Sequence, residues 1–232
     1  MITMNPWQKV FINLAHHYGR QNWWQNNRLE DWLMMILVQR TNARNVALAV
    51  QNLQDVMSLD QLLALTPAEL EDRVHPARFY KQKAIRIRTA LEWLANAGGD
   101  FSVISQHPAA ELRSQLLTLP GIGPETADVM LLYTFDKPTF VADEYARRLS
   151  ARLGLGDYKT YTTMYTAMAP FAATLSLDDA RELHALIDEH GKTQTRHPYD
   201  DKFLLQDTVS VDQWPAQAVL QDGPRGEPRV TK

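Results

Sequence analysis

Asp143 is an acidic residue at a helix start whose carboxylate could do chemistry, although this segment taken alone favours a plain helix cap. It opens the segment DEYARRLSARLG, which is typical of a helix that begins at an aspartate N-cap. An ionised carboxylate can stabilise positive charge on a reacting group and can steer or deprotonate an attacking water. The helix N-terminus should lower the pKa of Asp143 and keep it charged at neutral pH. The alternative is that Asp143 only caps the helix, a contribution of about 1 kcal/mol.

A glycine-containing turn, LPGIGPETADVML at residues 119–131, is the second candidate site. Gly121 and Gly123 bracket a tight turn, and Leu119 and Ile122 should point inward. The proline that follows suits the first turn of a helix, where unpaired N–H groups carry the positive end of the helix dipole. Such a turn can bind phosphate and can position a DNA strand without reading its sequence. A plain helix–turn–helix with a glycine cap is the alternative.

Two adjacent tryptophans, Trp23 and Trp24, lie in the polar loop QNWWQNN. Exposed tryptophans are costly, and stacking on an unpaired base would use them at roughly 1–3 kcal/mol per base. The alternative is that both pack in the core or between domains.

Composition places few limits on function but excludes some chemistry. The 232 residues suit one or two soluble domains, and the net charge of −3 does not by itself indicate nucleic-acid binding. A local basic patch decides that question, and RFYKQKAIRIR at residues 78–88 has five basic residues and no acid. The chain has no cysteine, which excludes disulfides and cysteine-bound zinc or iron–sulfur clusters. Without a signal-like or membrane-spanning segment, we expect a cytoplasmic protein with no membrane partner.

Hydrophobic spacing predicts an all-α fold. Helix start signals occur at Ser58, Thr66 and Asp143. Helices are predicted at residues 10–17, 29–38, 45–57, 58–65, 67–74, 81–97, 108–117 and 125–133. After Asp207 the periodicity is lost, which predicts an extended or mobile tail; packing of its Trp214 and Leu220 across the surface is the alternative.

The wider pattern LPGIGPxTA resembles the helix–hairpin–helix of the endonuclease III superfamily of DNA base-excision glycosylases. The resemblance extends over residues 29–191 and includes ILVQRTNARNV, RFYKQKA, FVADEYARRL and LHALIDEHGK. It implies a two-lobed all-α fold with the flipped base and Asp143 in a cleft between the lobes. The implied lobes are a six-helix lobe at residues 27–137, which ends in the hairpin, and a second lobe at residues 1–26 plus 138–205, followed by the tail at 206–232.

The resemblance also implies a mechanism. Asp143 matches the catalytic aspartate of the family, whereas Glu125 occupies the position of the lysine that cleaves the strand in bifunctional members. A carboxylate cannot form the Schiff base that β-elimination needs. The resemblance therefore implies a monofunctional glycosylase that leaves an abasic site. Glu125 itself is expected to be an ordinary acid in a first helical turn, and the lack of cysteines places the chain with members that have no iron–sulfur cluster.

The implied substrate is an alkylated base, because the chain is most similar to the 3-methyladenine branch, which carries an aromatic pair where this chain has Trp23 and Trp24. Gln25 replaces the proline of that branch, so this match is incomplete. Met34 and Met35 occupy the position of the catalytic glutamate of the adenine branch, which argues against that branch. An aromatic pocket would favour a cationic alkylated base by cation–π attraction. A glycosylase for uracil, a mismatched base or an oxidised base, or a non-catalytic binder of damaged DNA, remain alternatives.

The expected partner is double-stranded DNA with a damaged base, bound by a monomer. By resemblance, Gln39 fills the hole left by the flipped base and Phe79 wedges the opposite strand, although Phe79 could also be a core residue. The remaining expected DNA contacts are Gly121, Ile122, Gly123, Thr126, Lys81 and Lys83. For Lys81 and Lys83 a solvated helix face is the alternative.

The resemblance further implies a Na+ or K+ ion held by backbone carbonyls around Leu119 and Gly121. No side-chain metal site is predicted, because the histidines lack ligand spacing. His190 is expected to form a hydrogen bond within its own helix.

Overall fold

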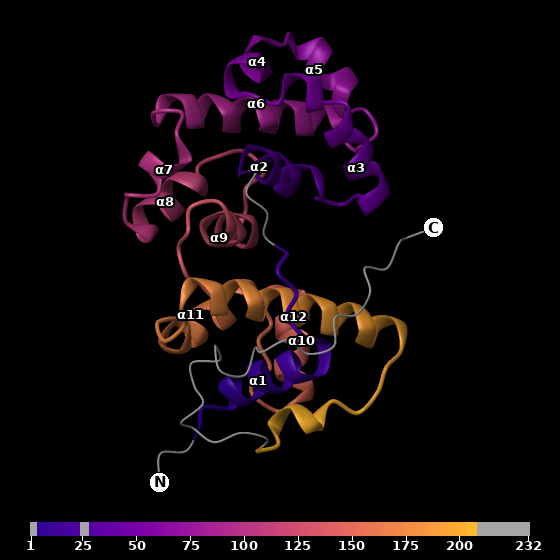
Figure 1. Cartoon of the computed structure of the whole chain (residues 1–232), viewed down its shortest axis with the longest axis vertical. Helices are drawn as coiled ribbons and strands as arrows, with labels where there is room; N and C mark the ends of the chain where they lie inside the picture. The colour runs from indigo at the N-terminus through magenta and orange to yellow at the C-terminus, as the bar shows by residue number, and fades with distance from the viewer. Residues whose placement is uncertain (1–3, 24–27, 208–232) are drawn as a thin grey trace. The chain divides into compact units, whose positions relative to one another are not determined.

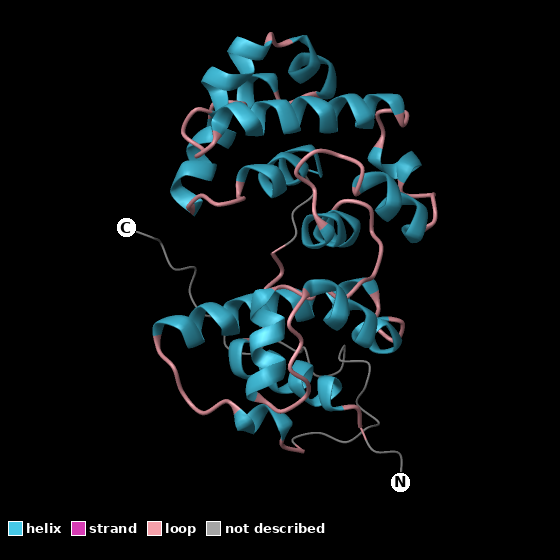
Figure 2. Cartoon of the chain, turned by 180° about the vertical axis from the view of Figure 1, so that it is seen from behind, coloured by secondary structure: helices cyan, strands magenta, loops and turns pink. Residues whose placement is uncertain are grey.

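The computed structural model describes residues 4–23 and 28–207, and all regular structure in these ranges is helical (Figure 2). The all-α prediction is therefore confirmed. The chain divides into two compact units, one within residues 25–137 and one formed by residues 1–24 and 138–232. The predicted tail beyond residue 207 and Trp24 lie outside the described residues.

The unit within residues 25–137 is an array of short helices around one long helix, α6 (Figure 1). Its described part has eight α-helices, where the resemblance implies six; the short helix at residues 101–104 was not among the predicted helices. In chain order they are α2 (Arg28–Leu37), α3 (Ala43–Gln51), the 3₁₀ helix η1 (Gln54–Val56), α4 (Leu59–Ala64), α5 (Pro67–Val74), α6 (Tyr80–Asn96), α7 (Phe101–Ile104), α8 (Ala109–Leu116) and α9 (Pro124–Tyr133).

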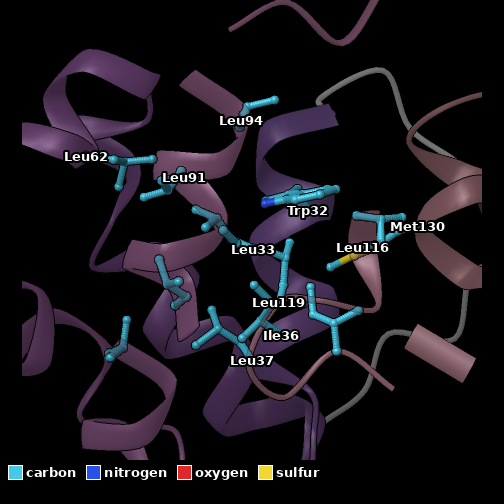
Figure 3. Close-up of a cluster of buried hydrophobic side chains, with 14 of the residues drawn as sticks. Trp32, Leu33, Ile36, Leu37, Leu62, Leu91, Leu94, Leu116, Leu119 and Met130 are labelled. Atoms are coloured by element: carbon cyan, nitrogen blue, oxygen red, sulfur yellow. The ribbon is translucent and has the colours of Figure 1, made fainter. Parts of the chain in front are cut away.

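Helix α2 forms the centre of this unit's core (Figure 3). Trp32, Leu33 and Ile36 are fully buried, as the dense apolar run of the sequence predicts. Trp32 stacks on Trp93 of α6 at 5.7 Å between ring centroids and meets Phe135 edge-on at 5.5 Å. Burial of aromatic side chains of this size dominates core energetics, so α2 ties α6 to α9.

The helix predicted at residues 45–57 is wrong in its second half. Helix α3 ends at Gln51, and a 3₁₀ turn follows. Arg73 of α5 donates to the Asn52 carbonyl at 2.5 Å, and the Asn52 amide donates to the Arg73 carbonyl at 2.9 Å. The first bond satisfies the Asn52 carbonyl, which a continuing helix would otherwise pair, and the second joins the Asn52 side chain to the end of α5, so the break depends on a tertiary contact.

The predicted helix starts are confirmed. Ser58, Thr66 and Asp143 are N-caps whose side chains accept from the N–H group three residues later. Thr66 forms a complete capping box with Glu69, followed by a proline in the first helical turn.

The other unit consists of four α-helices and a 3₁₀ turn in its described part: α1 (Pro6–Tyr18), α10 (Glu144–Arg152), α11 (Tyr161–Ala172), α12 (Leu177–Arg196) and η2 (Lys202–Leu205). Helix α12 packs against both α10 and α1, and η2 packs against α1. Gly191 makes the close approach of α12 to α10 possible, because a Cβ there would lie 2.2 Å from the Tyr145 ring.

Polar side chains hold the segment that follows α12. His190 Nε2 lies 3.1 Å from Asp201 Oδ2, which also accepts from Arg152 Nε at 2.8 Å. His190 Nδ1 lies 3.0 Å from the Tyr18 hydroxyl. His190 therefore bonds outside its own helix, contrary to the prediction, because it faces α1 and the returning chain. This network fixes the segment that follows α12.

Within the described residues, no helix is long and apolar enough to cross a membrane.

Candidate active site and DNA-binding hairpin

Asp143 is a buried N-cap with its two oxygens in different surroundings. Its side chain is 12% exposed; Oδ1 accepts from the Ala146 N–H at 2.7 Å, and Oδ2 lies 3.8 Å from His184 Nε2. The capping role is therefore real. It occupies one oxygen and directs the other toward α12.

Burial raises the pKa of Asp143 to about 6, and the negative charge of Asp188 adds to the rise. Backbone N–H groups at the start of α10 oppose the shift but do not cancel it, so the expected lowering of this pKa is wrong. The carboxylate is still the main form at pH 7. A buried carboxyl with a raised pKa is more typical of a functional group than of a simple cap.

His184 is the neighbour that the sequence analysis did not identify. Its burial lowers its pKa to about 4, so its imidazole is neutral at physiological pH. Because this imidazole is neutral, it forms no ion pair with the Asp143 carboxylate and leaves the negative charge of Asp143 uncompensated.

One face of α12 carries His184, Asp188 and Lys192, spaced four residues apart. Lys192 forms an ion pair with Asp188. This spacing of four residues can be read in LHALIDEHGK and was the available signal for a shared helix face. The sequence did not show which residues of other segments would lie against that face. We call Trp23, Asp143, His184, Asp188 and Lys192 the Asp143 cluster.

Trp23 is fixed over the same face of α12. The Glu182 carboxylate accepts from the Gln21 N–H at 2.5 Å and the Asn22 N–H at 3.4 Å, and so anchors the loop. The Trp23 ring lies 6.5 Å from the His184 ring and 4.9 Å from Lys192 Nζ. With 39% of its surface exposed, Trp23 is not a core residue.

The predicted hairpin joins α8 to α9. Leu119 and Ile122 are buried as expected, at 8% and 6% exposed, and Pro124 is the first residue of α9. Gly121 has φ +77, which few other residues adopt without strain. Arg113 and Asp128 join the two helices through a pair of hydrogen bonds of 2.7 and 3.0 Å.

Gln39 is bonded to the hairpin. Its Nε2 donates to the Gly121 carbonyl at 3.0 Å and lies 3.4 Å from Thr126 Oγ1, while its Oε1 accepts from Arg86 Nη1 at 2.8 Å. Arg86 lies so close over the turn that a Cβ at Gly121 would be 2.2 Å from its Nε. The end of α2 and the middle of α6 thus hold the turn in place.

Phe79 has the features of a wedge rather than of a core residue. It is 54% exposed and has φ +58, a conformation that is strained for a bulky side chain. Beside it is a pocket of about 380 Å³ lined by Gln39, Arg40, Phe79, Gln82, Lys83, Arg86 and Gly121. A strained, exposed aromatic residue next to a basic hollow suggests a contact with a partner.

The two lysines differ. Lys81 is exposed, whereas Lys83 is 1% exposed and donates to the Leu37 carbonyl at 2.7 Å. The prediction that Lys83 meets phosphate or solvent is wrong, because its ammonium caps the C-terminus of α2, where carbonyls are unpaired. Burial and, to a lesser degree, Arg86 lower the pKa of Lys83.

Glu125 is exposed in the first turn of α9, a favourable place for an acid. Within the described ranges, no three side chains of histidine, aspartate or glutamate are grouped as a metal site would require.

Comparisons with known proteins identify the family and the fold. The chain is 33% identical over 189 residues to a protein of Methanocaldococcus jannaschii named as a DNA repair glycosylase, which covers 79% of this chain and 86% of the relative. It is 33% identical over 120 residues to an endonuclease III of Thermotoga maritima, across 51% of this chain and 53% of that protein.

Among solved structures, the fold is similar to that of the H. pylori 3-methyladenine DNA glycosylase bound to 1,N6-ethenoadenine. The TM-score is 0.64 at 24% identity, with 82% of this chain and 99% of the other covered. A trapped endonuclease III–DNA covalent intermediate also has a TM-score of 0.64, at 18% identity, with 86% and 90% covered. The model of the HhH-GPD superfamily base excision DNA repair proteins matches residues 33–173, and the chain belongs to this family.

Proposed function

We propose that the chain is a monofunctional DNA glycosylase that flips out an alkylated base of the 3-methyladenine type and hydrolyses its N-glycosidic bond with Asp143. The observation that carries the proposal is the setting of Asp143. It is a buried carboxylate with one oxygen used for capping and the other directed toward His184, beside a half-exposed tryptophan.

The chemistry follows from this setting. As the bond between the base and sugar C1′ lengthens, positive charge develops on the sugar, and the Asp143 carboxylate stabilises it. Asp143 also removes a proton from the water that adds to C1′, and the base leaves with the bonding electrons. Trp23 provides a surface on which a flipped base can stack. Trp24, which the resemblance pairs with it, lies outside the described residues.

No amine is placed to act as a nucleophile at the hairpin. Glu125 stands where a lysine would be required, and the Lys192 ammonium is held by Asp188. Water is therefore the attacking group in this proposal, and the product is an intact strand with an abasic site.

For DNA binding, we assign the backbone N–H groups of the first turn of α9, past Pro124, to a phosphate, and Phe79 to the opposite strand. Gln39 braces the hairpin in the DNA-free protein, so filling the hole left by the flipped base would require it to exchange these bonds. Lys81 is available to phosphate, whereas Lys83 is not.

The implied Na+ or K+ is compatible with the hairpin carbonyls. The Gly121 carbonyl accepts from Gln39 and the Leu119 carbonyl accepts from the Ile122 N–H at 3.1 Å, which leaves each oxygen a second lone pair. Such an ion would add positive charge beside the phosphate.

The test is base release from DNA treated with a methylating agent, followed by strand analysis with and without hot alkali. We expect release of 3-methyladenine, with strand breaks only after alkali. Breaks without alkali would contradict the monofunctional mechanism. No release by the wild type, together with unchanged DNA affinity in Asp143→Asn, would indicate a different lesion or a non-catalytic binder.

A further inference from the structure

Lys192 already makes the interaction that a cationic base would need. Its ammonium lies 4.9 Å from the centre of the Trp23 ring and pairs with Asp188 one helical turn earlier. A cation over the face of an indole is attracted by the ring quadrupole, so this contact is favourable. The neighbouring Gly191 packs directly against Tyr145, which fixes the backbone of α12 beside Lys192.

The face of the Trp23 ring that Lys192 occupies can hold only one cation at a time. A base that carries positive charge and stacks on this face of Trp23 has to displace the Lys192 ammonium or lie against it, and like charges at such distances repel. Displacement would also break the ion pair with Asp188. A neutral base meets no such repulsion.

The ammonium also offers hydrogen-bond donors. Asp188 engages it from one side, and an ammonium carries three N–H groups. A ring nitrogen or carbonyl oxygen on the edge of an uncharged base could accept from the others, whereas a cationic base would bring its positive charge next to the ammonium.

We propose that Lys192 sets a charge preference within the proposed activity: it biases the base pocket toward an uncharged modified base with an acceptor edge, such as 1,N6-ethenoadenine, so that cationic bases of the 3-methyladenine type are still released but with a lower kcat/KM. The proposal rests on the proposed function, in that Trp23 is taken as part of the base pocket. It modifies the expectation from sequence that an aromatic pocket would favour a cationic base.

The negative groups nearby strengthen the expected effect of removing Lys192. Asp188 is neutralised by Lys192, and His184 is uncharged. In Lys192→Met, the ring face becomes available and Asp188 loses its partner, and both changes favour a cationic base. Lys192→Arg keeps the charge and the ring contact.

The test compares kcat/KM for a duplex with a single 1,N6-ethenoadenine with that for release of 3-methyladenine from methylated DNA. We expect Lys192→Met to shift the ratio by roughly tenfold toward the cationic base, on the scale of one cation–π contact. Lys192→Arg should keep the wild-type ratio. Lys202→Met, which removes an exposed lysine of η2, should also keep it.

A binding measurement tests the role of Lys192 without relying on turnover. Tryptophan fluorescence would follow titration with an uncharged etheno-adenine base and with a permanently cationic methylated adenine. We expect the wild type to prefer the uncharged base and Lys192→Met to reverse or abolish the preference. The same preference in both proteins, or no binding of either base, would overturn the role of Lys192. If the bases bind as expected but no lesion is released, the glycosylase proposal fails and the charge selection stands.

Discussion

The hairpin and the Asp143 cluster place their functional groups in opposite ways. The hairpin offers backbone N–H and carbonyl groups from one short segment, with Gly121 at φ +77 and Pro124 at the start of α9. The Asp143 cluster brings together side chains from a loop, the cap of α10 and one face of α12. Local sequence sets the conformation of the hairpin, which Gln39 and Arg86 then brace, whereas tertiary packing alone assembles the Asp143 cluster.

This difference should be visible in how each region tolerates change. A backbone site is lost when the chain cannot adopt its conformation, whatever the side chain carries. A side-chain cluster is lost when one group is neutralised, even where the fold is intact. Substitutions in the two regions distinguish these two cases.

The largest expected effect is that of Asp143→Asn. Asparagine is also a good N-cap, so the start of α10 should be kept while the negative charge is lost. We expect base release to fall by about 10²–10⁴-fold, with DNA affinity unchanged or higher. Single-turnover excision and a binding titration measure the two quantities. Loss of DNA binding in parallel with activity would mean that Asp143 is structural.

The pH dependence should also report on Asp143. Because its pKa is about 6, the required carboxylate is protonated progressively below that pH. The rate of excision under subsaturating DNA should therefore fall about tenfold for each pH unit below 6 and level off above it. Binding of an abasic-site duplex over the same pH range is the control. A rate that stays constant down to pH 4.5 would be inconsistent with an essential buried carboxylate.

The hairpin counterpart is Gly121→Ala. The new Cβ would lie 2.2 Å from Arg86 Nε and would sit on a residue with φ +77, so both the bond from Arg86 to Gln39 and the turn should be disturbed. We expect duplex affinity to fall by roughly tenfold, with the loss shared by undamaged DNA because phosphate contacts carry no sequence information. Gly154→Ala is a matched control, since Gly154 has φ +70 but nothing within 4 Å of its Cβ position. An equal loss in both variants would attribute the effect to strain alone.

What could be predicted from the sequence alone follows the same division between local and tertiary determinants. The all-α fold, the caps at Ser58 and Thr66, and the inward Leu119 and Ile122 were predictable because each depends on neighbours within a few residues. The breaking of the helix near Asn52 was not, because its cause is a contact with Arg73.

The site shows the same limit. Asp143 was predictable as an N-cap, but the direction of its pKa shift was not, since burial by distant segments outweighs the helix terminus. The sequence shows His184 and Lys192 at helical spacing, but it does not show that Trp23 lies against them. The burial of Lys83 against the Leu37 carbonyl likewise needed the fold.

Asp143 should also cost stability, which the same Asn variant would reveal. The pKa is about 6 in the folded protein and near 3.9 in an unfolded chain, so the folded state holds its proton more tightly. Below pH 4 both states are protonated and the residue contributes no penalty; the penalty grows between pH 4 and 6 and is complete above 6. Asp143→Asn should therefore raise the free energy of unfolding at pH 8 by on the order of 2 kcal/mol, and by little at pH 4. Urea unfolding at the two pH values measures this, and a variant that is less stable at pH 8 would contradict the buried-charge account.

The smallest expected change in stability is that of Phe79→Gly, which tests the wedge. Glycine relieves the strain at φ +58, and a side chain that is 54% exposed loses little packing, so stability should change by no more than about 1 kcal/mol. Excision from duplex DNA should nevertheless fall several-fold, whereas excision from a single strand, which has no opposite strand to wedge, should be unchanged. Phe79→Leu keeps an apolar wedge and serves as the control. A large loss of stability in the glycine variant would instead identify Phe79 as part of the core, and the hairpin side of the molecule would then bind DNA through backbone groups and Lys81 alone.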